Sequence, residues 1–179
     1  MARYFSSICI LFACLCFSLA PAFSAESDDD EGAGFPDFNL ENLKGDKISD
    51  EKAFGDADLI IIDFFTYYCK PCKKFWPYID EFYKEYGDAG LKAVLFDEDE
   101  PEGIPLTRSY MKQKGFTFEV LFDTGGDIES FFSVDKHPTA ILLDAEGNIV
   151  YRHEGYNKGD EEIIEAKIVE YLTSIGNLE

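Results

Sequence analysis

The sequence predicts an α/β domain in which a central mixed β-sheet is flanked by helices. Apolar runs of strand length alternate with segments of helical periodicity from residue 34 onward, and this alternation is typical of parallel strands joined by helices. The last two strands are joined by a short turn at 144–148, which indicates an antiparallel hairpin. With 179 residues, the chain is long enough for one domain with a substantial core.

The first 25 residues have the layout of a secretory signal peptide. Arg3 is their one charged residue, and an apolar run at 8–20 is followed by small residues. We expect cleavage after Ala22. An uncleaved membrane anchor is an alternative, since a span needs about 20 apolar residues, and lipidation at Cys14 is another. All three predict that the rest of the chain works in the periplasm or another extracytoplasmic compartment.

An acidic linker and then the folded domain are expected next. Residues 26–33 are mostly acidic and have nothing to bury, so we expect them to be disordered, with the domain at 34–179. Apolar residues alternate around a Lys-Gly-Asp turn within 35–48, which predicts an N-terminal β-hairpin. The run at 59–65 is apolar on both faces except for Asp63, as in a central strand.

The remaining elements follow from the same periodicities. Apolar and aromatic residues recur at helical spacing over 71–86, which predicts a helix with one buried face and a kink at Pro77. We further expect a strand at 91–96, a helix at 104–114, a strand at 118–122, a short helix at 127–132, strands at 139–143 and 148–153, and a helix at 160–175.

The cysteines point to redox chemistry. Apart from three in the targeting segment, the chain has only Cys69 and Cys72. A disulfide between them closes a very short loop and removes little chain entropy, so the pair is expected to be reactive and not structural. It lies where a strand gives way to a helix, and a helix N-terminus stabilises a thiolate. We expect Cys69 to be the nucleophile and Cys72 the resolving thiol.

The same cysteines could instead belong to a metal site. Zinc normally takes four ligands, and beyond residue 25 the sequence offers only His137 and His153 as further soft ligands. We therefore expect no metal and no cofactor. A copper-handling protein that uses Cys69, Cys72 and His137 stays open as an alternative.

Two segments carry a family resemblance. Phe35-Pro-Asp-Phe-Asn-Leu and Cys69-Lys-Pro-Cys-Lys-Lys-Phe-Trp-Pro resemble the N-terminal hairpin and the active-site helix of the exported TlpA/ResA-like protein disulfide reductases. The resemblance covers 34–175. It implies the thioredoxin fold, with an N-terminal β-hairpin extension and an inserted strand–helix element. It also implies protein disulfides as substrates and a membrane thiol–disulfide protein as electron donor.

The resemblance also assigns site residues. Pro138 matches the cis proline that lies against the active-site sulfurs, and Asp63, six residues before Cys69, matches the buried acid that moves protons. Burial should raise the pKa of Asp63; a carboxylate held by a local hydrogen bond is the alternative. His137 is a candidate to stabilise the Cys69 thiolate and make the pair more oxidising. Alternatively, its ring points to solvent.

Departures from the family pattern leave the substrate open. Phe75 stands where relatives in cytochrome c maturation commonly have a glutamate, and Tyr68 replaces the usual tryptophan. A disulfide oxidase or isomerase of the same fold is the main alternative. A peroxiredoxin is a further one, because Thr66 and Cys69 fit its Thr-x-x-Cys motif, although Ile62 stands in the place of its proline.

Charge excludes one class of partner. The net charge of −20 is incompatible with nucleic acid binding. An acidic block at 97–102 follows a predicted parallel strand, and loops at the carboxyl ends of such strands surround the active site. The block is a candidate for steering a basic partner, with solubility as the alternative.

Overall fold

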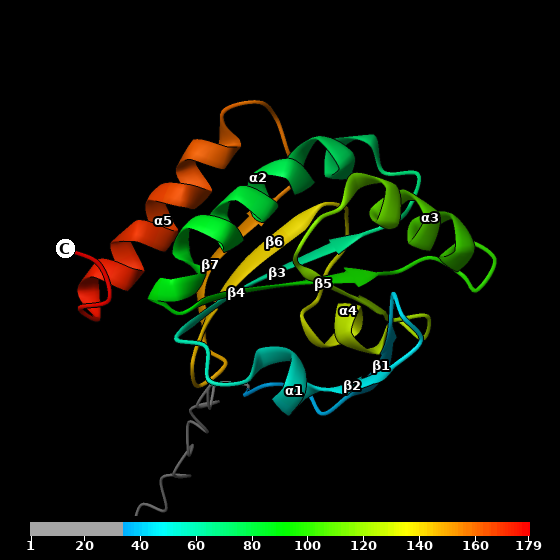
Figure 1. The fold of residues 1–179 in the computed structure, drawn as a ribbon, viewed down its shortest axis with the longest axis horizontal. Helices are drawn as coiled ribbons and strands as arrows, with labels where there is room; N and C mark the ends of the chain where they lie inside the picture. The colour runs from blue at the N-terminus through cyan, green and yellow to red at the C-terminus, as the bar shows by residue number, and fades with distance from the viewer. Residues whose placement is uncertain (1–33) are drawn as a thin grey trace, which may run out of the picture. The chain divides into compact units, whose positions relative to one another are not determined.

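The computed structural model describes residues 34–179, which form a seven-stranded mixed sheet in the order β2-β1-β5-β4-β3-β6-β7 (Figure 1). Strands β3, β4 and β5 are parallel, while β6 is antiparallel to both β3 and β7. The strands are β1 (Asn39–Asn42), β2 (Lys47–Ser49), β3 (Leu59–Phe65), β4 (Leu91–Asp97), β5 (Glu119–Phe122), β6 (Thr139–Asp144) and β7 (Ile149–Glu154). The signal peptide expected at 1–25 and the linker expected at 26–33 lie outside the described residues.

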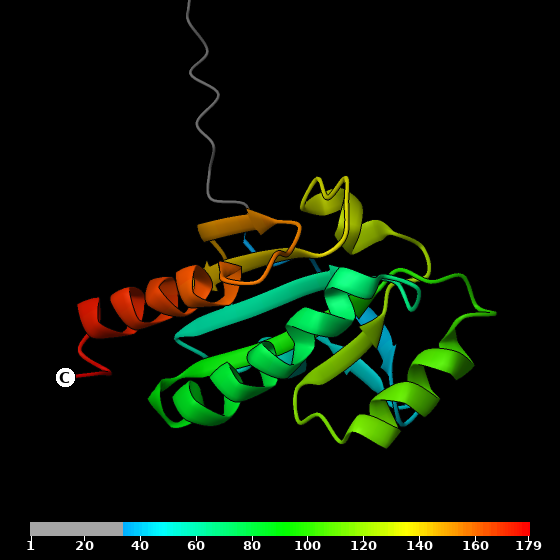
Figure 2. The same ribbon diagram turned by 90° about the horizontal axis from the view of Figure 1, so that it is seen from above.

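Helices cover both faces of this sheet (Figure 1), and Figure 2 looks onto the face that the longer helices cover. They are α1 (Asp50–Phe54), α2 (Lys70–Tyr86), α3 (Ile104–Lys114), α4 (Asp127–Phe131) and α5 (Asp160–Ser174), with a 3-10 turn, η1, at Gly87–Ala89. Helices α2, α3 and α5 pack on one face, and α1 and α4 pack on the other. None of the helices from residue 34 to residue 179 combines the length and the apolar character needed to cross a membrane.

Strand β3 forms the centre of the core, and all seven of its residues are buried. Because side chains alternate along a strand, Ile61 and Phe65 pack toward α2 and α5, whereas Ile60 and Ile62 pack toward α1 and α4. Burying one such side chain contributes about 1.5–3 kcal/mol. The near-continuous apolar run is therefore explained by burial on two sides, as predicted.

The mixed sheet and the predicted elements are confirmed, most with ends shifted by only one or two residues. Helix α1 was not predicted. It is only five residues long, too short for a helical periodicity, and it begins where Ser49 Oγ accepts a hydrogen bond from Lys52 N at 3.3 Å. Helix α2 continues through Pro77 without ending, although proline supplies no backbone donor.

The topology brings the ends of several strands together at a single edge of the sheet. Strands β3, β4, β5 and β7 end at this edge and antiparallel β6 begins there, so we call it the reactive edge. The β6–β7 turn lies at the opposite edge. There Gly147 has a φ of +86°, and a Cβ on it would lie only 2.7 Å from the backbone carbon of Gly34. The described chain therefore enters the fold beside that turn.

Candidate active site

Cys69 and Cys72 form a disulfide at the reactive edge, between the end of β3 and the first turn of α2. Cys69 is the N-cap of α2, and its Sγ accepts a hydrogen bond from the backbone N of Cys72 at 3.2 Å. Cys72 is fully buried, whereas Cys69 is partly exposed. An incoming disulfide can therefore reach Cys69 first, which agrees with the predicted order of attack.

Positive charge and aromatic rings surround the start of α2. The helix has no acid in its first turn, so its N-terminal dipole favours a thiolate on Cys69. Lys73 Nζ lies 3.6 Å from the centre of the Tyr67 ring and 4.7 Å from that of Tyr110. Partial burial lowers the pKa of Lys73, and the charge of Asp99 opposes this shift. Lys73 is thus held close to the cysteine loop.

Asp63 lies in β3 on the face that α2 covers, and it is completely buried. Within the described residues, neither of its carboxylate oxygens has a hydrogen-bond partner of normal geometry. Burial raises the pKa of Asp63 well above its usual value, and the nearby indole N–H of Trp76 opposes this rise. A buried acid with a raised pKa is a stronger base than an ordinary carboxylate and is suited to proton transfer.

Pro138 lies at the same edge, because the next residue, Thr139, pairs with Phe64 near the end of β3. The His137–Pro138 peptide bond is cis, and the carbonyl oxygen of Pro138 accepts a hydrogen bond from Gly155 N at 2.7 Å. The ring of His137 is paired with α4, since Nε2 lies 3.0 Å from Glu129 Oε1. The structure thus brings the predicted proline and histidine to the edge where the cysteines lie.

An acidic segment beside the cysteines adds groups that the sequence did not single out one by one. Asp99 Oδ2 accepts a hydrogen bond from Tyr67 N at 2.5 Å, which ties the segment to the cysteine loop. Burial, with a contribution from Asp99, raises the pKa of Asp97 to about 7. Burial and the charge of Asp123 raise the pKa of Glu98 to about 9. The acidic run directly after a strand was the sequence signal for this cluster.

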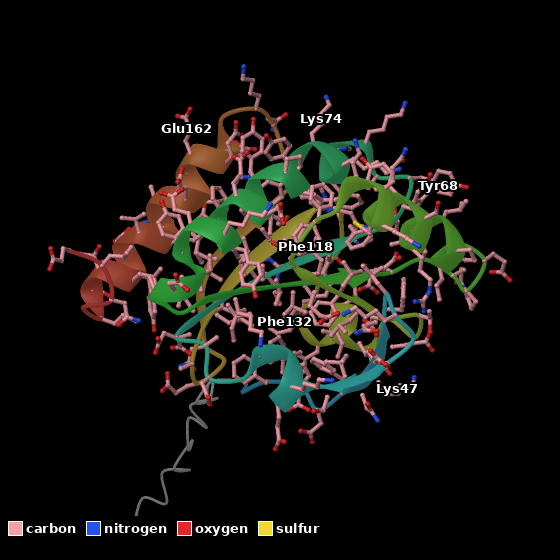
Figure 3. The ribbon with its side chains drawn as sticks, viewed as in Figure 1. Lys47, Tyr68, Lys74, Phe118, Phe132 and Glu162 are labelled. Atoms are coloured by element: carbon pink, nitrogen blue, oxygen red, sulfur yellow. A yellow bond between two sulfur atoms is a disulfide. The ribbon has the colours of Figure 1, made fainter. Side chains whose placement is uncertain are left out.

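Aromatic and basic side chains are exposed around the site (Figure 3). Tyr68, which precedes Cys69, is 73% exposed and lies beyond the start of α2, and Lys74 points outward from the same helix. Among residues 34–179, no group of three or more His, Cys, Asp or Glu side chains is placed to hold a metal ion.

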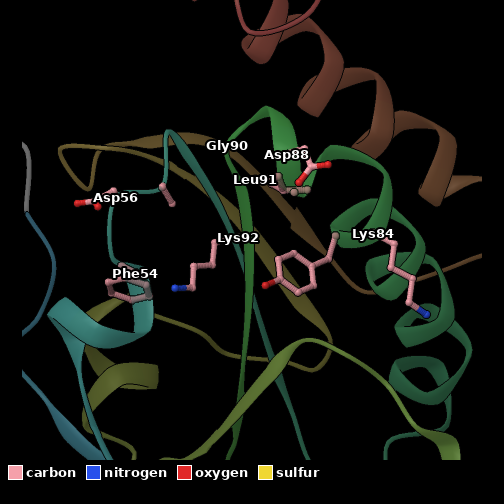
Figure 4. A pocket seen from close by; sticks show the side chains of 10 residues that line it. Phe54, Asp56, Lys84, Asp88, Gly90, Leu91 and Lys92 are labelled. Atoms are coloured by element: carbon pink, nitrogen blue, oxygen red, sulfur yellow. The ribbon is translucent and has the colours of Figure 1, made fainter.

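A cavity of about 460 Å³ lies away from the cysteines (Figure 4). Its lining includes Phe54, Lys84 and Lys92 and belongs to α1, the end of α2 and the start of β4. These parts lie at the edge opposite the reactive edge. The cavity contains neither cysteine nor Asp63 nor Pro138, so it is separate from the candidate active site.

Known proteins share the sequence and fold of this chain. Residues 32–152 match the model of the AhpC/TSA family. The thiol-disulfide oxidoreductase ResA of Bacillus cereus is 30% identical over 153 residues, which cover 86% of this chain and 83% of that protein. A thioredoxin-like protein of Porphyromonas gingivalis has a TM-score of 0.66 at 28% identity, over 78% of this chain and 92% of its own. StoA of Bacillus subtilis, at 22% identity, has a TM-score of 0.60 over 74% of this chain and 96% of its own. The predicted thioredoxin fold is confirmed.

Proposed function

Since this chain belongs to the AhpC/TSA family and is a thiol-disulfide oxidoreductase, we propose that it reduces protein disulfides outside the cytoplasm. The observation that carries the proposal is the Cys69–Cys72 pair at the start of α2, with one sulfur partly exposed and the other buried. The signal-like sequence at 1–25 supports export.

The reaction has two exchange steps. The Cys69 thiolate attacks one sulfur of the substrate disulfide, which gives a mixed disulfide and releases the first substrate thiolate. Cys72 then loses its proton and attacks the Cys69 sulfur, which forms the Cys69–Cys72 disulfide and releases the second substrate thiol. Two electrons pass from the dithiol to the substrate. A membrane thiol–disulfide protein returns two electrons to the oxidised pair.

Asp63 is proposed to accept the proton that Cys72 loses. Its side chain lies on the sheet face under α2, and Cys72 is buried on that same side in the core that α2 forms with the sheet. A carboxylate in this dry environment has the raised pKa needed to exchange protons with a thiol. The Pro138 backbone, at the same edge, is proposed to lie along the bound substrate peptide.

The reduction potential of the Cys69–Cys72 pair tests the proposed direction. The protein without residues 1–25 would be equilibrated with glutathione or dithiothreitol buffers, and the reduced fraction would be measured by mass spectrometry after alkylation. A potential at or below about −250 mV, near that of thioredoxin, is expected for a reductase. A value near −120 mV, in the range of strong disulfide oxidants, would overturn the assignment.

The proposed partners can be captured with a trapping variant. In Cys72→Ser the first exchange step still occurs but the second cannot, so mixed disulfides accumulate on Cys69. Mass spectrometry of these adducts from extracytoplasmic fractions should identify substrate proteins and the membrane donor. Cys69→Ser, which lacks the attacking sulfur, is the control and should trap far less. Equal trapping by both variants would contradict the assigned order.

The position of His137, directly before the cis Pro138, favours one second candidate, a disulfide oxidase. A protonated imidazole near the sulfurs would stabilise the thiolate of the reduced form and raise the potential. The same titration separates the two functions, because a reductase is expected at or below about −250 mV and an oxidase near −120 mV.

A further inference from the structure

A second cavity, of about 470 Å³, lies directly beside the cysteine pair. It is formed between the first half of α2 and the loop that joins β7 to α5. Its lining is Pro71, Lys74, Tyr78, Tyr156, Asn157 and Lys158. Pro71 stands between the two cysteines in sequence, so the cavity adjoins the site of exchange.

The aromatic wall of this cavity is fixed in place. The Tyr156 ring stacks on Phe75 at 5.0 Å and lies 6.3 Å from the ring of Tyr78. The Tyr156 hydroxyl donates a hydrogen bond of 2.8 Å to Glu161 Oε2, which also accepts one from Gly159 N. Because Glu161 is only 7% exposed, its carboxylate serves to hold the loop.

The charge of the cavity opposes that of the whole chain. Its lining includes two lysines and no acid, whereas the chain carries a net charge of −20. Lys74 and Lys158 are exposed, and neither forms an ion pair with any residue in the described range. Asp160, the first residue of α5, pairs with His153 at 3.1 Å and accepts a hydrogen bond from the backbone N of Asn157.

The acidic segment around Asp99 lies on the other side of the cysteines. In the sheet order, β4 and β7 flank the β3–β6 pair. Asp99 follows β4 and Tyr156 follows β7, while Cys69 follows β3 between them. A substrate over Cys69 therefore meets acids on one side and lysines with tyrosines on the other.

The spacing along α2 defines how far a substrate must reach. At about 1.5 Å per helical residue, Lys74 and Tyr78 lie roughly 7.5 and 13.5 Å along the helix from Cys69. An extended peptide advances about 3.4 Å per residue. A substrate residue about two to four positions from the attacked cysteine can therefore enter the cavity.

We propose that this cavity is a substrate subsite for an acidic side chain, placed two to four residues from the cysteine that Cys69 attacks. The carboxylate pairs with Lys74 and Lys158, while the aliphatic part of the side chain packs on Tyr78 and Tyr156. This inference rests on the proposed function, because it concerns the substrate of the same cysteine pair. It predicts a preference for acidic side chains, whereas the net charge of −20 would by itself favour basic ones.

Three disulfide-linked peptide dimers test the subsite. They are identical and have blocked ends, except for Glu, Gln or Lys three residues after the cysteine. Second-order rate constants of their reduction by the dithiol form of the protein would be measured at low ionic strength. The proteins are wild type, the double variant Lys74→Gln/Lys158→Gln, and the control Lys47→Gln/Lys52→Gln. The control removes the same charge from exposed residues of β2 and α1.

We expect wild type and the control to reduce the Glu peptide about threefold to tenfold faster than the Lys peptide, because each exposed charge pair contributes a factor of about two to five. In Lys74→Gln/Lys158→Gln the ratio should fall to one or below. Equal rates for the Glu and Lys peptides in wild type, or a faster Lys peptide, would overturn the subsite. So would an equal loss in the control variant.

An uncharged substrate separates this inference from the proposed function. Hydroxyethyl disulfide has no carboxylate, so all three proteins should reduce it at equal rates. If they do and the Glu preference is absent, only the subsite fails. If the wild-type dithiol fails to reduce hydroxyethyl disulfide and all the peptides, the reductase assignment itself fails.

Discussion

Burial raises the pKa of Asp63 and so makes its carboxylate a stronger base, and this property should be visible in the second exchange step. We predict that Asp63→Asn slows the attack of Cys72 on the mixed disulfide by about tenfold to hundredfold at neutral pH, because general base catalysis typically contributes that much or more. Quenched-flow trapping with mass spectrometry would measure the mixed disulfide. It should accumulate in Asp63→Asn and stay low in wild type.

The pH profile separates a proton-transfer role from a packing role. If Asp63 only fills space, the slowing by Asp63→Asn should be the same at every pH. If it accepts a proton, the defect should shrink at high pH, where hydroxide deprotonates Cys72 without help. A pH-independent defect would refute the role in proton transfer.

His137 should influence the reduction potential of the cysteine pair. We predict that His137→Leu lowers the reduction potential by about 20–60 mV, since 30 mV corresponds to about 1.4 kcal/mol for a two-electron couple. Glu129→Gln should shift the potential in the same direction, because Glu129 Oε1 contacts the His137 ring and holds it in place. His153→Leu is the matched control, as His153 pairs with Asp160 on the β7 side. An unchanged potential in His137→Leu would contradict the role.

The raised pKa of Glu98 predicts how the stability of the fold depends on pH. Burial and the nearby acids raise its pKa from 4.5 to about 9 in the folded protein. Between these two values the unfolded chain has lost the proton that the folded chain keeps, so stability falls as pH rises from about 4.5 to 9. Glu98→Gln should flatten this fall and stabilise the protein by about 1–2 kcal/mol at pH 8. Urea unfolding at pH 5 and pH 8 would measure both effects, and an equally steep fall in Glu98→Gln would contradict the assignment.

The residues of the site differ in how far the sequence could predict them. Cys69 and Cys72 were predicted from their own spacing and their place before a helix, whereas Asp63 and Pro138 were assigned through the family resemblance. The raised pKa of Glu98 depends on Asp123 and on Glu129, which come from a different strand end and a different helix. No local pattern reports that proximity, because it is created by the parallel pairing of β4 and β5.

At the scale of elements, one arginine connects α3 to the N-terminal hairpin. Arg108 donates hydrogen bonds to the carbonyl oxygens of Asn42, at 2.8 Å, and Leu43, pairs with Glu41, and lies over the ring of Phe122. A lysine has the charge but not the planar fork of donors. We predict that Arg108→Lys costs about 1–2 kcal/mol of unfolding free energy.

The loss from Arg108→Lys should be local to the hairpin. Hydrogen exchange of the amides in β1 and β2 should speed up, while that of β3 should follow only the global change. Lys112→Gln, an exposed position on the same helix, is the control and should change neither. A variant with unchanged hairpin protection would show that Arg108 does not anchor these strands.

The elements themselves were largely predictable because most are long or strongly patterned. The seven buried residues of β3 and the apolar stripe of α2 are visible in the sequence. The pairing of β1 with β5 is not, because Glu41 and its partner Phe122 are separated by some eighty residues. The sequence indicated a hairpin but not the strand against which it packs.

At the scale of the whole molecule, the net charge of −20 should cost stability through self-repulsion. Salt screens this repulsion, since the Debye length falls from about 10 Å at 0.1 M to about 3 Å at 1 M. We predict that raising NaCl from 0.05 to 0.5 M increases the melting temperature by about 2–4 °C, equivalent to roughly 1 kcal/mol for a domain of this size. Calorimetry would measure this shift, and an unchanged or lower melting temperature would contradict it.

The close approach of Gly147 to Gly34 shows at which end of the molecule the described chain begins. The chain enters the fold beside the β6–β7 turn, and Pro138 and the cysteine pair lie at the other end of β6, which at about 3.3 Å per residue is roughly 20 Å away. Any surface to which the preceding residues are attached would therefore be joined to the domain at the end opposite the cysteine pair. The sulfurs would then face away from that surface.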